Sequence, residues 1–289
     1  LDVLPVTPQD VIAAHMFRHL LFYGFEKPLT ELQAETRQQE ISPAPQLPNT
    51  AITLGSNATA IAPSRSRDGS TLLMINSHQP LTGPVSWYEV HLQSGEGLNV
   101  MGGLFIGSPA LGVGFNQYHG WGATVNQPDL VDVYVLEMDP EDDNRYRLDG
   151  EWLELEAFDI PIKVLVWGWL PWTVKEKGYR SIHGPVMKTD HGTYALRYAG
   201  MGEIRQVEQW LAMSAATSFE EWREAMALQH IASFNFVYAN ADGDIHFVHN
   251  AMMPRRAVGW QWDQYLPGNR RDLIWDCLLY TSDAADEKV

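Results

Sequence analysis

The chain has 289 residues, of which 45% are hydrophobic and 19% charged, and its formal net charge is −16. This hydrophobic fraction can build a large core, which excludes a collagen-like or intrinsically disordered chain. The negative balance disfavours nucleic acid as a partner, because a phosphate backbone would be repelled, and it is compatible with cation binding.

The sequence shows no segment that predicts membrane insertion or export. Its longest uncharged apolar run, residues 164–172, is too short to cross a bilayer. No basic-then-apolar signal segment follows Leu1, so either the protein is cytosolic or its true N-terminus lies upstream. The single cysteine, Cys277, excludes an internal disulfide and a cysteine-rich metal site.

The first predicted element is a helix that begins after Thr7. Thr7 suits the N-cap, Pro8 the first helical position, and Asp10 the third, where its carboxylate completes a capping box. Apolar residues then recur with helical spacing as far as Tyr23. The Pro-rich stretch 42–49 is predicted to be an extended linker.

After residue 56 the pattern changes to short apolar or alternating runs separated by Gly and Pro, which predicts antiparallel strands. A capping box at Ser218 predicts a second helix to about His230, and residues 241–244 predict a hairpin turn. Many antiparallel strands with few helices are typical of the α+β class. The strands are predicted at 57–62, 71–76, 88–92, 100–106, 111–115, 131–138, 148–166, 234–240 and 245–249.

Gly55 and Ser56 stand where the linker meets the first predicted strand. Most Gly-Ser pairs are turn residues. If the peptide bond before Ser56 broke, however, the serine would become a chain terminus. Its α-amine, with an ordinary pKa of about 7.7–8.0, would then be a base beside the hydroxyl. Spacing alone leaves both interpretations open.

Several short motifs between residues 55 and 268 follow one another in a characteristic order. They are Gly-Ser-Asn-Ala at 55–58, Leu-Met-Ile-Asn-Ser-His at 73–78, Trp-Tyr-Glu-Val-His-Leu at 87–92, Gly-Val-Gly-Phe-Asn at 112–116, Gly-Trp-Gly-Ala-Thr-Val-Asn at 120–126, Asp-Leu-Val-Asp-Val-Tyr at 129–134, His-Gly-Pro-Val at 183–186, Asn-Phe-Val-Tyr-Ala at 235–239 and Leu-Pro-Gly at 266–268. Together they resemble the penicillin acylase family of N-terminal nucleophile hydrolases, and most closely its cephalosporin and acyl-homoserine lactone acylase branch.

The resemblance implies an αββα sandwich, in which two antiparallel sheets stack between helical layers. It implies that residues 1–27 end an α-chain, that 28–55 form a spacer ending at the autoprocessing site, and that 56–275 begin a β-chain. Residues 276–289 look like a translated adapter and are predicted to be non-native, with a frayed acidic C-terminus as the alternative. The family's chains are longer in both directions, so we expect an internal fragment that is inactive without the remainder of its α- and β-chains.

The resemblance also implies a reaction. The precursor would cleave itself between Gly55 and Ser56, and Ser56 would then attack the amide of a small acylated amine, such as an acyl-homoserine lactone or a β-lactam side chain. No cofactor is expected for catalysis, and the relatives point to the periplasm. The alternative is a non-catalytic calcium- or carbohydrate-binding β-module, or a degenerate acylase relative.

Further site residues follow from the same resemblance. The backbone N–H of Val125 and the side-chain amide of Asn235 would stabilise the oxyanion. His78 would orient Ser56 or its water, although a histidine at a strand end can be purely structural. Arg256 would support folding or processing, with Arg255 an equal candidate and a solvated surface arginine the alternative.

A structural calcium site is expected at Asp129, Val131 and Asp132, where two carboxylates and a backbone carbonyl offer oxygen ligands. The alternative is an ordinary acidic strand edge.

Four tryptophans invite a different interpretation: Trp152, Trp167, Trp169 and Trp172. Clustered aromatic rings can form a carbohydrate-binding face. Because they stand in alternating strand patterns, core packing is the favoured interpretation.

Overall fold

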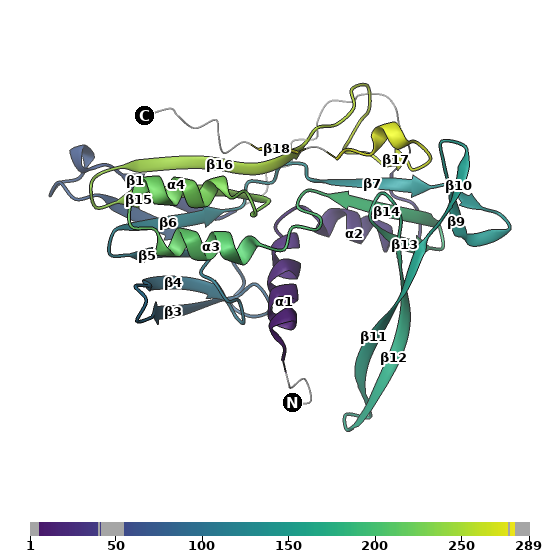
Figure 1. The fold of residues 1–289 in the computed structure, drawn as a ribbon, viewed down its shortest axis with the longest axis horizontal. Helices are drawn as coiled ribbons and strands as arrows, with labels where there is room; N and C mark the ends of the chain where they lie inside the picture. Colours follow the sequence, from purple (N-terminus) through teal and green to yellow (C-terminus); the bar gives the residue numbers. More distant parts are fainter. Residues whose placement is uncertain (1–5, 40, 42–54, 277, 281–289) are drawn as a thin grey trace.

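The computed structural model describes residues 6–39, 41, 55–276 and 278–280, and shows two large β-sheets with helices packed on and between them, together with two smaller sheets (Figure 1). The larger sheet has seven strands in the order β18-β16-β15-β6-β5-β4-β3, with antiparallel neighbours. Its strands are β3 (Trp87–Gln93), β4 (Asn99–Phe105), β5 (Val113–Asn116), β6 (His119–Thr124), β15 (Ser233–Asn240), β16 (Ile245–Pro254) and β18 (Leu278–Tyr280).

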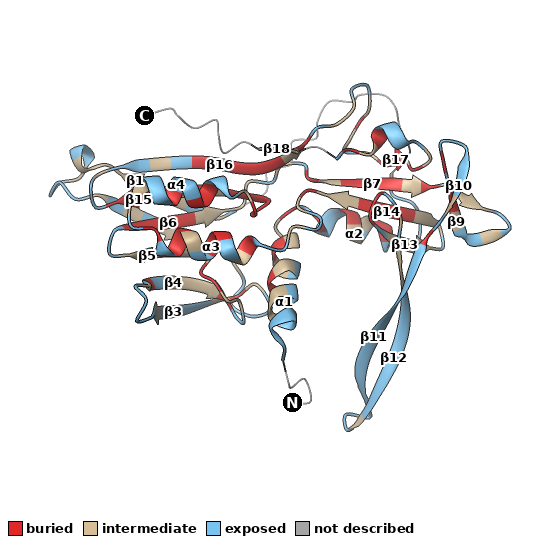
Figure 2. Cartoon of the chain, in the orientation of Figure 1, coloured by how far each residue is buried: buried red, intermediate tan, exposed pale blue. Residues whose placement is uncertain are grey.

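Two helices, α3 (Gln206–Ala215) and α4 (Phe219–Ala227), cover one face of this sheet (Figure 1). The strand β15 alternates so that Phe236 and its apolar neighbours point to the helices, where the ring of Phe236 lies 5.5 Å from that of Trp210. Figure 2 shows the resulting burial along the contact between helices and sheet.

The opposite face of the seven-stranded sheet carries a short hairpin, β1 (Asn57–Ile61) with β2 (Leu72–Asn76). Helices, large sheet and hairpin form three successive layers in the described residues. Helix α1 (Pro8–Leu20) begins with the predicted capping box, in which Thr7 and Asp10 exchange hydrogen bonds.

The second sheet has six strands in the order β11-β12-β13-β14-β7-β17. Helix α2 (Glu26–Leu32) packs against it because Leu32 and Phe25 are buried with Tyr194 and Val133. The strands are β7 (Val131–Leu136), β11 (Glu156–Val166), β12 (Leu170–Arg180), β13 (Pro185–Thr189), β14 (Gly192–Tyr198) and β17 (Leu266–Pro267). A three-stranded sheet joins β8 (Met138–Asp139), β9 (Asp142–Leu148) and β10 (Glu151–Glu154), and 3-10 turns lie at Pro63–Arg65 and Arg271–Leu273.

The structure confirms the α+β class, the hairpin turn at 241–244 and the helix capped by Ser218, which is α4. Helix α3 was not predicted, because its buried Gln206 and Gln209 interrupt the apolar pattern. The linker at 42–49 lies outside the described residues. No described helix is long and apolar enough to cross a membrane.

The prediction that the clustered tryptophans pack in a core is wrong. Strands β11 and β12 form a ribbon that projects from the body of the molecule (Figure 1), and its tip exposes 80% of Trp167 and 70% of Trp169. Trp172 and Trp152 are also exposed. The alternating pattern is present, but no other described element covers the apolar face of this ribbon.

Candidate active site

Ser56 lies directly before strand β1 and is partly buried, whereas Gly55 is exposed. Its hydroxyl oxygen accepts a hydrogen bond of 3.1 Å from the backbone N–H of His78. This contact follows from the register of the hairpin, in which Asn57 pairs with Asn76, so the residues on either side of that pair also lie together. The hairpin therefore holds the Ser56 hydroxyl at the open end of its two strands.

Glycines on β6 determine how the hairpin approaches the large sheet. A Cβ added to Gly122 would lie only 3.0 Å from Cβ of Ala58, so the two strands are in close contact. Thr124 follows Gly122 by two residues and Ser56 precedes Ala58 by two, so these residues are on the same faces as Gly122 and Ala58. The stacking of the layers thus puts Ser56 over the end of β6.

Asn235 lies opposite Thr124 in the register of β15 with β6. Its Nδ2 donates a hydrogen bond of 3.3 Å to Oγ1 of Thr124, and its Oδ1 lies 2.9 Å from Nδ1 of His249. The side-chain amide of Asn235 therefore directs its oxygen toward His249 on β16. Its N–H groups are directed toward the face of the sheet that carries the hairpin. Asn235, Thr124 and Ser56 share this face of the sheet.

Val125 follows the last residue of β6, beyond the last register pair with β15. Within the described part of the chain, its backbone N–H has no backbone hydrogen-bond partner. Residues 125, 235 and 56 are thus brought to one end of the layered region, and their catalytic roles stay predictions.

Two hollows meet at Ser56. An open cavity of about 710 Å³ is lined by Ser56, Val125 and residues of α2 and the 125–131 segment. A smaller recess of about 20 Å³ lies beside it, lined by Ser56 and Val125 together with apolar side chains. Those include Phe22, Trp87, Phe105, Trp210 and Phe234. The serine hydroxyl therefore lies between an open cavity of mixed lining and a small apolar recess.

The imidazole of His78 does not make the contact with Ser56. It is exposed, and its Nε2 lies 3.1 Å from Nδ2 of Asn76 and 3.5 Å from Nδ2 of Asn57. The hydrogen bond to the hydroxyl comes from the main chain, which any residue type at this position could supply. The role assigned to the histidine ring stays a prediction.

Arg256 joins the two carboxylates that were expected to bind calcium. Its Nε lies 3.0 Å from Oδ2 of Asp132, and its Nη1 lies 2.9 Å from Oδ2 of Asp129. The indole N–H of Trp275 donates to the same oxygen of Asp132 at 2.6 Å. Burial raises the pKa of Asp132 to about 6, against the opposing effect of Arg256. Arg256, rather than Arg255, is thus the arginine of this network.

The donor set at this position is compatible with a hard cation. Oδ1 of Asp132 is buried and has no hydrogen-bond partner among the described residues, and Asp129 supplies a second carboxylate. Arg256 already balances part of their charge.

Asn126 ends the motif at 120–126 and had no predicted role. Its Nδ2 donates to the carbonyl oxygen of Asn250 at 2.8 Å, and its Oδ1 accepts from the hydroxyl of Ser233. The sequence feature that could have indicated these contacts is an amide side chain directly after Val125.

A profile of the penicillin amidase family matches residues 2–285. The chain is 32% identical over 224 residues to the acyl-homoserine lactone acylase PvdQ of Pseudomonas fluorescens, covering 71% of this chain and 27% of that protein. It is 27% identical over 228 residues to the penicillin G acylase of Escherichia coli, covering 73% and 26%. A thermostable penicillin G acylase from Alcaligenes faecalis has a similar structure, with a TM-score of 0.66, 25% identity, and 80% of this chain and 41% of the other covered. The chain thus spans about a quarter to a third of the curated relatives it matches.

Proposed function

Because the chain belongs to the penicillin amidase family, we propose that it is the catalytic part of a self-processing serine acylase. The proposed reaction is hydrolysis of the amide bond of a small N-acylated amine. The observation that supports it best is the placement of Ser56 at the end of the layered region that also carries Asn235 and Val125.

Scission of the bond between Gly55 and Ser56 would free the α-amine of the serine. That amine would take the hydroxyl proton, directly or through a water, while Oγ attacks the amide carbonyl carbon. The negative charge that develops on the carbonyl oxygen would be stabilised by Nδ2 of Asn235 and the N–H of Val125. The amine product leaves with the proton, and water then cleaves the ester of Ser56 to release the carboxylic acid.

The open cavity beside Ser56 is large enough for a small substrate, and both apolar and polar side chains line it. The neighbouring recess has room for little more than one water molecule, so the proposed substrate places its acyl group and its amine in the larger cavity. Among the relatives, PvdQ is named for acyl-homoserine lactones and the Escherichia coli protein for penicillin G. We propose an acyl-homoserine lactone or a β-lactam with an acyl side chain as the substrate class.

A structural calcium ion is part of the proposal, with the carboxylates of Asp129 and Asp132 and the carbonyl of Val131 as ligands. It would offset the repulsion between the buried carboxylate of Asp132 and the exposed one of Asp129, and it would anchor the start of β7. Calcium should raise the melting temperature of the wild type but not of Asp132→Asn. An equal shift in both would contradict this site.

The periplasm is proposed as the location of the whole protein, in keeping with its resemblance to the acylases. Separation of periplasm from cytosol in expressing cells, with antibody detection, tests this. Recovery in the cytosol alone would contradict it.

The proposed function is tested on the complete precursor that carries this chain. Intact-mass analysis should show two chains, one of which begins at Ser56, and Ser56→Ala should remain a single chain without hydrolytic activity. A panel of acyl donors of different length would then define the substrate. A variant Ser56→Ala that retains activity would contradict the mechanism.

The exposed tryptophans favour a second candidate, a carbohydrate-binding or degenerate module without catalysis. Trp167, Trp169 and Trp172 extend from the ribbon with their rings accessible. Retention on insoluble polysaccharides that is lost in Trp167→Ala, together with an uncleaved precursor, would support this candidate over the acylase.

A further inference from the structure

The two proposed oxyanion donors come from different strands, and catalysis requires a fixed distance between them. Asn235 lies within β15, whereas Val125 lies beyond the end of β6. The pair of Asn235 with Thr124 is the last in this ladder, so the ladder itself does not hold the backbone that follows.

Asn126 ties this backbone to the neighbouring strands. Its Oδ1 accepts a hydrogen bond from Oγ of Ser233, which lies on β15 two residues before Asn235. Its Nδ2 donates to the carbonyl oxygen of Asn250 on β16 at 2.8 Å. The planar side chain next to Val125 therefore contacts both β15 and β16.

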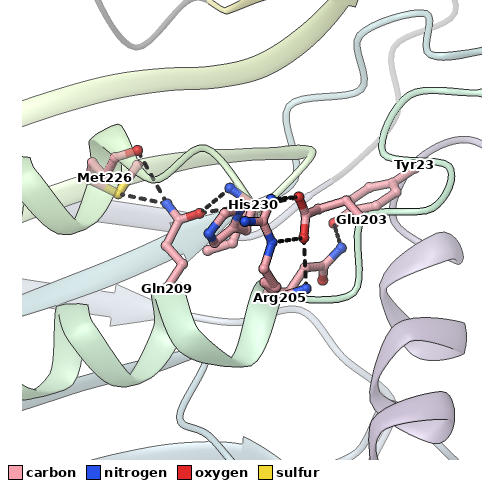
Figure 3. A network of polar contacts seen from close by, with 8 residues as sticks. Tyr23, Glu203, Arg205, Gln209, Met226 and His230 are labelled. Carbon is pink, nitrogen blue, oxygen red and sulfur yellow. Dashed lines mark hydrogen bonds and ion pairs between the residues drawn. The ribbon is translucent and has the colours of Figure 1, made fainter.

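Asn250, to which Asn126 donates, is itself held by a hydrogen bond to the segment 230–231, which precedes β15. Nδ2 of Asn250 donates to the carbonyl oxygen of Ile231 at 2.8 Å. Oε1 of Gln209 on α3 accepts from the backbone N–H groups of His230 and Ile231, at 2.7 and 2.9 Å. Figure 3 shows Gln209 between His230 and Met226. Since Gln209, Asn250 and Ser233 are nearly fully buried, they give Asn126 a rigid anchor.

We propose that Asn126 is a positioning residue that fixes the N–H of Val125 relative to Nδ2 of Asn235. This inference rests on the proposed function. An asparagine is required because one group must accept from a hydroxyl and donate to a carbonyl; aspartate cannot donate and alanine can do neither. Asn126 has no proposed contact with substrate, so its effect passes through Val125.

The test compares Asn126→Ala with Asn116→Ala in the complete, processed protein. Asn116 is a matched control, because its side chain also bonds backbone groups: it donates to the carbonyl of Ala216 at 2.8 Å and accepts from the N–H of His119 at 2.9 Å. These contacts lie at the other end of β6, away from Ser56.

In Asn126→Ala we expect kcat to fall roughly 10–100-fold with KM within about twofold, because a misplaced donor acts on the transition state. Asn116→Ala should lower the melting temperature while kcat per folded molecule stays within about twofold of wild type. Ser233→Ala removes the hydroxyl that donates to Asn126 and should also lower kcat. It replaces Asn126→Ala in the test if that variant does not fold. Equal kcat losses in Asn126→Ala and Asn116→Ala would overturn the proposal.

A second readout does not depend on activity. Hydrogen exchange of residues 121–126 should be faster in Asn126→Ala than in the wild type and unchanged in Asn116→Ala. Unchanged exchange in Asn126→Ala would overturn the positioning role. A wild-type protein without amide hydrolysis would instead contradict the proposed function, so the two failures are distinguishable.

Discussion

Asn235 and His249 face each other directly across the β15–β16 ladder, with Nδ1 of the imidazole 2.9 Å from Oδ1 of the amide. Because an amide oxygen can only accept, donation from Nδ1–H keeps Oδ1 on the side of His249. Nδ2 is therefore directed to Thr124 and the hairpin layer. A histidine on the neighbouring strand β16 thus determines which way the proposed oxyanion donor points.

Replacing either member of this pair should affect the transition state. Asn235→Ala should lower kcat by about 10²–10³, because an oxyanion donor is lost. His249→Ala should cost about tenfold, since a freely rotating amide presents Nδ2 only part of the time. In a double-mutant cycle His249→Ala should add little to Asn235→Ala. Fully multiplicative losses would show that His249 acts by another route.

Gly122→Ala should disturb the contact between the hairpin and the large sheet. The new methyl group would lie 3.0 Å from Ala58 and from Ile75. Overpacking of this kind costs about 1–3 kcal/mol, and it should displace Ser56 as well. Gly95→Ala is the control, because nothing lies within 4 Å of its added Cβ. Urea unfolding and kcat measure both effects; equal stability of the two variants would contradict the close contact.

Acid should destabilise the protein partly through His19. Burial lowers the pKa of His19 to about 4, and its Nδ1 donates to the carbonyl of His15. Because the folded pKa lies below the unfolded value of 6.5, this contribution is fully present above pH 6.5. It is lost as the pH falls from 6.5 toward 4, by about 1.4 kcal/mol per unit. His19→Asn keeps a donor but does not titrate, so urea unfolding at pH 7.5 and pH 5 should show a smaller loss than in wild type. Equal losses would contradict the assignment.

Removing Arg256 should leave Asp132 as an uncompensated buried charge. Arg256→Ala should lower the free energy of unfolding by about 3–5 kcal/mol near pH 7, and Asp132→Asn in that background should restore part of it. The folded pKa of Asp132 lies above the ordinary value of 3.8 for an aspartate. The folded state therefore binds this proton more tightly, and stability falls as the pH rises from 4 through 6. Arg256→Ala should raise this pKa further, so the fall should continue to higher pH; the same pH range in both proteins would contradict the role of Arg256.

Much of the fold was predictable where local chemistry decides it. The capping residues of α1 and α4 and the Asp-Gly turn between β15 and β16 act within a few residues, so sequence patterns indicate them directly. Helix α3 was not predicted because the polar residues Gln206 and Gln209 are buried in it. Their side chains form hydrogen bonds with groups distant in sequence, and hydrophobic periodicity does not indicate such contacts.

The family resemblance nominates Ser56, Val125 and Asn235 for the site, and their roles stay predictions. The structure brings these three residues to one end of the layers, but their contacts could not be predicted from sequence. That His78 contacts Ser56 by its backbone, and that Arg256 joins Asp129 to Asp132, depends on strand register and on the packing of segments far apart in the chain. Such contacts are set in three dimensions.

The central claim is that Ser56, once freed from Gly55, carries the acyl group. The complete protein should be quenched in acid during turnover of a slow acyl substrate and digested with trypsin, and the peptide from Ser56 to Arg65 should be analysed by mass spectrometry. The account predicts a peptide that begins at Ser56 and carries the acyl mass on that residue. Substrate turnover with this peptide unmodified, or with the acyl group on another residue, would contradict it.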